Sequence, residues 1–227
     1  MVIQATVRHT TNSNEKSLDK ESQNKNPAQY ELDFLFYDRR LVKNSLLCYT
    51  NTKEGRLMSE LWDIYDKHKQ KTGRMAERDV YQFKEGEYHI VVTGIIMNSK
   101  NEILISQRAE HKKFGLMWEC SGGSILAGET SLEGIIRELK EELGIEFTKK
   151  EAIFLKEIRR DKIPPDFKDL WLFRKDIEIK DITFPDGEAI AAQWVTIEKF
   201  MEMFNKKEIV PTVDFGLKEY EKALRAK

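Results

Sequence analysis

The chain has 227 residues, of which 40% are hydrophobic, and this share is enough to form a folded core, which excludes a disordered protein. The 38 Lys and Arg residues nearly balance the 39 Asp and Glu residues, leaving a formal net charge of -1. Because non-specific nucleic-acid binding usually needs a clear basic excess, we expect no nucleic-acid partner.

The cysteines and histidines show no pattern of a disulfide-rich or zinc-binding protein. Cys48 and Cys120 form no CxxC pair, and the four histidines are scattered without zinc-ligand spacing. No apolar run approaches the roughly 20 residues of a membrane helix, and the N-terminus has no signal pattern. We therefore expect a cytoplasmic protein with free thiols and no membrane association.

The N-terminal quarter differs from the rest. Residues 1–28 are rich in Asn, Ser and Lys without a hydrophobic period, which predicts disorder, and residues 29–50 have no functional interpretation. We predict an N-terminal extension at 1–57 and a folded domain at 58–227. One hypothesis places the physiological start at Met58, because the Lys-Glu-Gly at 53–55 is what a purine-rich ribosome-binding site would encode. The mass of the native protein would test it.

From Met58 onward the chain reads as alternating strands and helices. Segments rich in apolar and β-branched residues predict strands at 60–66, 88–97, 103–109, 152–158, 169–179 and 190–196. Polar turns are expected at 67–74 and 98–102, and a loop at 114–123. Helical periodicity predicts helices at 130–143, 196–206 and 213–225. Because the elements do not alternate regularly, we predict an α/β (α+β) fold with a mixed sheet and helices on both faces.

The helix expected at 130–143 has two different faces. An apolar sector about 100° wide must face a core, and it is formed by Leu132, Ile135, Ile136, Leu139 and Leu143. A second sector carries Glu138, Glu141 and Glu142, with Gly134 one turn earlier. A glycine there costs roughly 1 kcal/mol against alanine, and we interpret it as leaving room for a phosphate or a metal ion.

Three glutamates at this spacing can bind a hard cation. Side chains three or four residues apart on a helix lie about 5–6 Å apart, and Mg²⁺ takes one or two carboxylates together with substrate phosphates. Such an ion lowers the pKa of a bound water for attack on phosphorus, and a remaining carboxylate can accept the proton. The alternative is the solvated face of an ordinary charged helix.

The surrounding residues decide between these interpretations. They match the pattern G-x5-E-x7-R-E-U-x-E-E-x-G-U, with U aliphatic, at Gly123, Glu129, Arg137, Glu138, Leu139, Glu141, Glu142, Gly144 and Ile145. This segment resembles the Nudix box, the signature of hydrolases that act on nucleoside diphosphates linked to another moiety. The resemblance implies an α/β/α sandwich with a mixed β-sheet.

The resemblance also implies a metal site. Glu138 and Glu142 would bind Mg²⁺ directly, with Mn²⁺ as a substitute, and Glu141 would bind it directly or through water. A backbone carbonyl of Gly122 or Gly123 would complete the site. Which carboxylate acts as general base is left open.

Further roles follow for the residues around the glutamates. Arg137 and Glu129 would form an ion pair that holds the loop against the helix, so the predicted catalytic set is Glu129, Arg137, Glu138 and Glu141. Gly144 fits a helix C-cap that needs a left-handed residue.

Residues 60–145 look like the Nudix branch related to type 1 isopentenyl-diphosphate isomerases, which raises isomerisation as an alternative activity. Those enzymes resemble one another in a reactive Cys within a TNxxCxHP-like segment after a Trp. Here Trp118 is followed by Glu-Cys-Ser-Gly-Gly, so the thiol is offset and the His is missing. We therefore interpret Cys120 as a packed residue. A catalytically silent binding module is the other alternative, against which the complete box argues.

The substrate is a small phosphorylated metabolite that the sequence does not name. Pro164 and Pro165 come slightly late for the family's ADP-ribose subgroup, and the motifs of the dinucleoside-polyphosphate and NADH subgroups are absent. Arg108 is our candidate for phosphate binding, as is the cluster Arg159, Arg160 and Lys162, with solvated surface as the alternative.

Two further pairs of residues have open interpretations. Asp166 and Asp169, in an expected loop, would supply a metal ligand or base, or be plain polar residues. Trp118 and Trp171 would stack on a base or pack in the core. From the family we also expect a homodimer.

Overall fold

The computed structural model describes residues 60–213, except residues 79 and 162–163. The predicted extension at 1–57, the Met58 start, Lys162 and, apart from Val213, the helix expected at 213–225 lie outside the described residues. Within the described part, no helix is long and apolar enough to cross a membrane.

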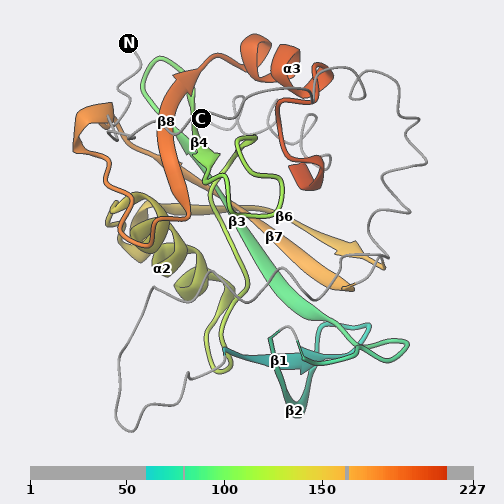
Figure 1. Ribbon diagram of the computed structural model, residues 1–227. Helices are drawn as coiled ribbons and strands as arrows, with labels where there is room; N and C mark the ends of the chain where they lie inside the picture. Colours follow the sequence, from blue (N-terminus) through green and yellow to red (C-terminus); the bar gives the residue numbers. More distant parts are fainter. Residues whose placement is uncertain (1–59, 79, 162–163, 214–227) are drawn as a thin grey trace, which may run out of the picture. The chain divides into compact units, whose positions relative to one another are not determined.

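The described chain begins with a two-stranded antiparallel sheet (Figure 1), formed by β1 (Leu61–Tyr65) and β2 (Lys71–Glu77). The polar turn predicted at 67–74 is therefore wrong from Lys71 onward. All but one residue of β2 are exposed, so its sequence shows no apolar alternation to reveal the strand. Lys69, with a φ of 59°, occupies the turn between the two strands.

The main sheet has the order β5-β4-β3-β7-β6, with β8 also paired to β4. Its strands are β3 (His89–Met97), β4 (Ile103–Arg108), β5 (Trp118–Glu119), β6 (Ala152–Arg160), β7 (Asp166–Arg174) and β8 (Ala189–Val195). The pair β3–β7 is parallel and the other pairs are antiparallel, so the predicted mixed sheet is confirmed.

Two differences from the predicted strands matter for the site. β7 starts at Asp166 rather than at 169 and ends at Arg174, because it follows β3 in register from the pair His89–Asp166 to the pair Met97–Arg174. β5 lies within the predicted loop at 114–123. Its two residues are too few for a periodic signal, and they pair with Ser106 and Gln107 of β4.

The helices cover opposite faces of the sheet. Helix α2 (Ser131–Leu143) packs in a cluster that we call the α2-side core, which includes Ile135, Leu139, Ile90, Val92 and Ile96. Helix α3 (Ile197–Asn205) packs in the α3-side core, which includes Phe200, Met203, Ile95, Met97 and Cys120. Because successive strand residues point to opposite faces, even- and odd-numbered residues of β3 feed the two cores. The predicted sandwich is confirmed.

Three short 3₁₀ helices complete the described elements. They are η2 (Lys149–Glu151), η3 (Ile179–Asp181) and η4 (Pro211–Val213).

The segment after β5 runs along β3. The backbone N–H groups of β3 residues Val92 and Gly94 donate to the carbonyls of Gly123 and Ser121, at 2.8 and 2.9 Å. The segment fits there because β3 and β4 pair only at Met97 and Ile103 and then diverge.

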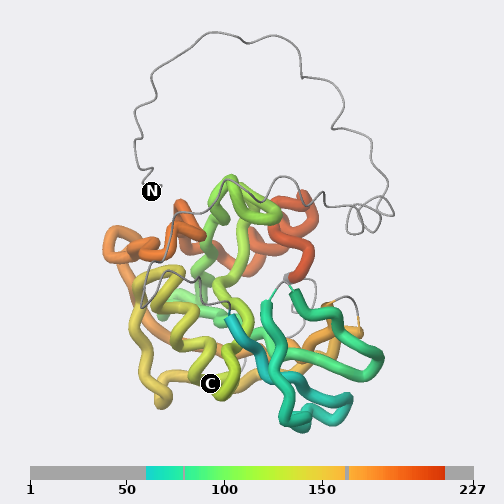
Figure 2. The backbone as a smooth tube through the Cα atoms, turned by 60° about the horizontal axis from the view of Figure 1, so that its bottom comes forward, coloured from blue at the N-terminus to red at the C-terminus, as the bar shows by residue number. Residues whose placement is uncertain are grey.

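The chain then passes beside the start of β1 before entering α2 (Figure 2). There the N–H groups of Ala127 and Gly128 donate to the Leu61 carbonyl and the Asp63 carboxylate, at 2.7 and 2.8 Å. The hairpin thus supports the loop that leads into α2.

Candidate active site

Helix α2 is fixed at both ends by its own sequence. At its N-terminus Thr130 and Glu133 form a capping box in which each side chain accepts from the other residue's backbone N–H. At its C-terminus Gly144 has a φ of 69°, the left-handed conformation predicted for it. The helix therefore presents its acidic side at a defined position over the segment 121–129.

The three glutamates of that side differ in exposure. Glu142 is buried, the side chain of Glu138 is 14% exposed, and that of Glu141 is 47% exposed. These three residues form an acidic stripe that runs from the buried Glu142 to solvent, with the accessible carboxylate of Glu141 at its outer edge.

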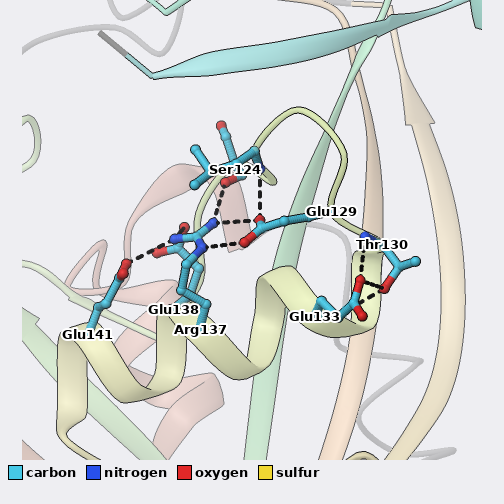
Figure 3. A network of polar contacts seen from close by, with 8 residues as sticks. Ser124, Glu129, Thr130, Glu133, Arg137, Glu138 and Glu141 are labelled. Atoms are coloured by element: carbon cyan, nitrogen blue, oxygen red, sulfur yellow. Dashed lines mark hydrogen bonds and ion pairs between the residues drawn. The ribbon is translucent and has the colours of Figure 1, made fainter. Parts of the chain in front are cut away.

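Arg137 connects the helix to the preceding loop (Figure 3). Its Nε and Nη2 donate to the two carboxylate oxygens of Glu129 at 2.8 and 3.0 Å, and Nη2 also donates to the Ser124 carbonyl at 3.1 Å. Nη1 donates to Glu138 and Glu141, each at 2.9 Å. The expected ion pair between Arg137 and Glu129 is therefore present, and the same guanidinium also holds two glutamates of the stripe.

Two consecutive glycines let the segment approach the glutamates. A Cβ on Gly122 would lie 2.1 Å from the Val92 carbonyl oxygen, and one on Gly123 would lie 2.5 Å from Oε1 of Glu138. The Gly122 N–H donates to Oε2 of Glu142 at 3.2 Å. The Gly123 carbonyl accepts the N–H of Val92, which leaves Gly122 as the better candidate for a carbonyl ligand.

Gly134 has a different role from the one predicted. A Cβ there would lie 2.5 Å from Cγ2 of Ile125, a residue that is 2% exposed. The prediction that Gly134 leaves room for a phosphate or metal is wrong, because the side chain of Ile125 fills that space.

Burial and mutual repulsion favour the protonated forms of the inner glutamates. Burial raises the pKa of Glu138 to about 7, against the opposing effect of Arg137, while Glu141 raises it further. Burial also raises the pKa of Glu142 well above its usual value, and the charges of Glu119 and Glu138 add to this.

These carboxylates fit a hard divalent cation. Their oxygens are the ligands that such ions prefer, and a cation would relieve the accumulated negative charge. In the described residues no three acidic, imidazole or thiol groups are already gathered around one point. Arg137 instead holds one oxygen each of Glu138 and Glu141.

Sequence reasoning missed Glu119. Its carboxylate, on β5, is paired with Nη1 of Arg108, and its charge acts on Glu142. The only sequence signal was its position three residues before Gly122, which has no meaning until β5 is known. Arg108, the predicted phosphate ligand, also donates through Nε to the Lys113 carbonyl at 2.8 Å, so it is held at the end of β4 on the side of Glu119.

Asp166 and Asp169 lie in β7 and not in the predicted loop. Both are buried, and each has a cationic partner: Asp166 accepts from Nε of Arg160 at 2.7 Å, and Asp169 from Lys69 at 2.6 Å. Arg159 pairs with an aspartate too, at residue 161. These side chains therefore form ion pairs that are separate from the hydrogen-bond network of Arg137.

Cys120 and the two tryptophans are packing residues. Cys120 is 4% exposed in the α3-side core, and Trp118 packs against the same core. Trp171 packs against the α2-side core, and its Nε1 donates to the Ser131 hydroxyl at 2.9 Å. The structure supports core packing over base stacking for both tryptophans.

Known proteins resemble the chain in sequence. The model of the NUDIX domain family matches residues 87–213. An uncharacterized Nudix hydrolase of Listeria innocua is 33% identical over 156 residues, which cover 67% of this chain and 89% of the relative. The 8-oxo-dGTP diphosphatase of Escherichia coli is 44% identical over 55 residues, covering 24% of this chain and 43% of that protein.

A solved structure resembles the fold. A crystal structure of a Deinococcus radiodurans protein superposes with a TM-score of 0.53 at 20% identity, covering 65% of this chain and 90% of the other. At that identity the similarity concerns the fold alone.

Proposed function

The chain belongs to the Nudix family and is a Nudix hydrolase, and on this premise we propose that it cleaves a phosphoanhydride bond by water attack on phosphorus. The substrate class that we propose is a nucleoside-diphosphate-type compound or a related small phosphorylated metabolite. The observation that carries the proposal is the stripe of Glu138, Glu141 and Glu142, supported from the loop side by Gly122 and Gly123.

We propose that Glu138 and Glu142 hold a divalent cation, Mg²⁺ or in its place Mn²⁺, together with the Gly122 carbonyl. When bound, the cation would screen the phosphate oxygens and lower the pKa of a coordinated water. Arg137 would orient Glu138 through the bond from Nη1, and Glu129 would keep Arg137 in place through two parallel hydrogen bonds.

Glu141 is our candidate for the general base. It is the most exposed of the three carboxylates, so a water attacking from the solvent side can reach it, and Arg137 fixes one of its oxygens. Its second role, as a metal ligand directly or through water, is compatible with the same position.

Arg108 is our candidate for a substrate phosphate. It lies at the end of β4 with its side chain 19% exposed, and Glu119 and the Lys113 carbonyl hold its guanidinium in one orientation. The Escherichia coli relative, an 8-oxo-dGTP diphosphatase by name, makes nucleoside triphosphates reasonable first members of a substrate panel.

Isopentenyl-diphosphate isomerisation, the activity suggested by the resemblance to that branch, is the less favoured alternative. It would need an accessible acid at Cys120, whereas this thiol is packed in the α3-side core. Incubation with isopentenyl diphosphate, followed by a search for its allylic isomer, separates the two. A homodimer and a cytoplasmic location stay predictions.

A hydrolysis screen tests the proposal. The protein is incubated with Mg²⁺ and a panel of nucleoside triphosphates and nucleoside diphosphate derivatives, and released phosphate and nucleotide are measured. Glu138→Gln and Glu142→Gln should each lower turnover by orders of magnitude. Glu146→Gln is the matched control, because this exposed glutamate follows α2 and its carboxylate pairs with Lys140 on the surface. Turnover near that of the wild type in both site variants would refute the assignment.

A further inference from the structure

Two buried hydroxyl groups lie side by side behind the candidate site. The Oγ atoms of Ser106 and Ser121 are 3.2 Å apart, and the two residues are 2% and 3% exposed. Ser106 is central in β4, where it pairs with Glu119 of β5 and Ala192 of β8, so its position is fixed by the sheet.

The Ser121 hydroxyl is in turn hydrogen-bonded to the carboxylate of Glu142. The next residue, Gly122, donates its N–H to Oε2 of the same carboxylate at 3.2 Å. Two consecutive residues of the segment after β5 thus supply a donor each to one buried glutamate of α2. Two donors at fixed positions determine the orientation of the carboxylate plane, which a single donor would leave free to rotate.

The direction of the hydrogen bonds follows from counting protons. A serine hydroxyl has one proton to donate, and an ionised carboxylate can only accept. In the ionised form of Glu142 that binds a cation, Ser121 donates to the carboxylate and its proton is used, so the contact between the two serines is then a donation from Ser106 to Ser121. The chain therefore runs from Ser106 through Ser121 to Glu142, and each donation strengthens the next one.

We propose that Ser121 is a positioning residue that orients the Glu142 carboxylate toward the cation, and that Ser106 acts through Ser121. The inference rests on the proposed function, since it assigns Glu142 to a metal site. It accounts for a polar pair buried on the α2 side of the sheet, next to Ala192 of the α2-side core, where two small apolar residues would otherwise pack without needing hydrogen-bond partners. Neither serine touches the reacting atoms.

Mn²⁺ binding to the full chain without substrate gives the test. Titration calorimetry and the electron paramagnetic resonance of free Mn²⁺ give the dissociation constant for the wild type, Ser121→Ala, Ser106→Ala and the double variant. We expect Ser121→Ala to weaken binding about tenfold and Ser106→Ala to weaken it less. The double variant should bind like Ser121→Ala alone, because the inference has Ser106 act on Glu142 through Ser121.

Controls separate orientation from general damage. Ser99→Ala, in the exposed turn between β3 and β4, removes a hydroxyl that is not part of the chain from Ser106 to Glu142 and should leave Mn²⁺ affinity unchanged. Thermal unfolding of the metal-free variants checks that each one folds, and Ser121→Thr, which restores a hydroxyl, should recover most of the affinity. Wild-type affinity in Ser121→Ala, or additive effects of the two alanine variants, would overturn the inference.

The outcome also distinguishes this inference from the proposed function. If the wild type does not bind Mn²⁺, or if Glu142→Gln binds it equally well, the metal site itself is wrong. If the wild type binds Mn²⁺ and Glu142→Gln does not, while Ser121→Ala binds normally, only the role of the serines is wrong.

Discussion

Gly123 and Glu138 are so close that a Cβ atom on the glycine would lie 2.5 Å from Oε1 of the glutamate and 2.6 Å from its Cδ. The first glycine of the sequence motif is thus explained by a side chain fifteen residues further along the chain. Its φ is not in the left-handed region, so the requirement is for space and not for backbone freedom.

Gly123→Ala should therefore displace the Glu138 carboxylate. Displacements of about 1 Å in a catalytic group can lower turnover roughly 100-fold, and we expect a loss of this order together with weaker Mn²⁺ binding. Steady-state hydrolysis and Mn²⁺ titration measure both effects. Ser124→Ala is the neighbouring control, because it keeps the backbone carbonyl to which Arg137 donates. Wild-type Mn²⁺ affinity in Gly123→Ala would contradict the assignment of Glu138 as a ligand.

Cation binding should be linked to proton release. Burial raises the pKa of Glu138 to about 7, so below that pH the free protein holds a proton that the cation must displace. Displacement of this proton should lower Mn²⁺ affinity by about tenfold per pH unit below 7, and the raised pKa of Glu142 adds to the loss in the same direction. Titrations at pH 6, 7 and 8 in buffers of different ionisation enthalpy measure the affinity and the protons released. Equal affinity at pH 6 and 8 would show that Glu138 is ionised throughout.

The sequence was sufficient to predict α2 and its acidic side, because both depend on local patterns. The apolar period, the capping residue Thr130 and the C-terminal Gly144 all lie within or next to the helix. The ion pair of Arg137 with Glu129 also spans only eight residues. Features of this kind follow from helix geometry alone and require no knowledge of the tertiary fold.

Features that depend on partners distant in sequence were missed. β2 has no apolar alternation, and it is a strand only because β1 pairs with it. The predicted role of Gly134 was wrong because the sequence of the helix does not show that Ile125 packs against this residue. Asp166 and Asp169 were predicted to lie in a loop, whereas the parallel register with β3 makes them strand residues.

Arg137→Lys should impair the site although it keeps the positive charge. Arg137 donates to Glu129, Glu138, Glu141 and the Ser124 carbonyl from one planar group, and a lysine ammonium cannot reproduce two parallel bonds to Glu129. We expect turnover to fall roughly 10- to 100-fold, measured by steady-state hydrolysis. Glu129→Gln should cause a loss of similar size. Because both changes break the same contact, the double variant should be no worse than the poorer single one, and multiplied losses would argue against a shared role.

Gly134→Ala tests whether packing or helix propensity dominates within α2. Propensity alone predicts a gain of roughly 1 kcal/mol, but the new methyl group would lie 2.5 Å from Cγ2 of Ile125, and overpacking of this kind costs roughly 1–3 kcal/mol. We therefore expect no gain or a net loss in the free energy of unfolding, measured by chemical denaturation.

In an Ile125→Ala background, which lacks Cγ2, Gly134→Ala should become stabilising. In an Ile125→Val background, which keeps both γ methyl groups, the penalty should persist. A stabilising Gly134→Ala in the wild-type background would mean that α2 and Ile125 can move apart, and the close contact would then no longer explain the glycine.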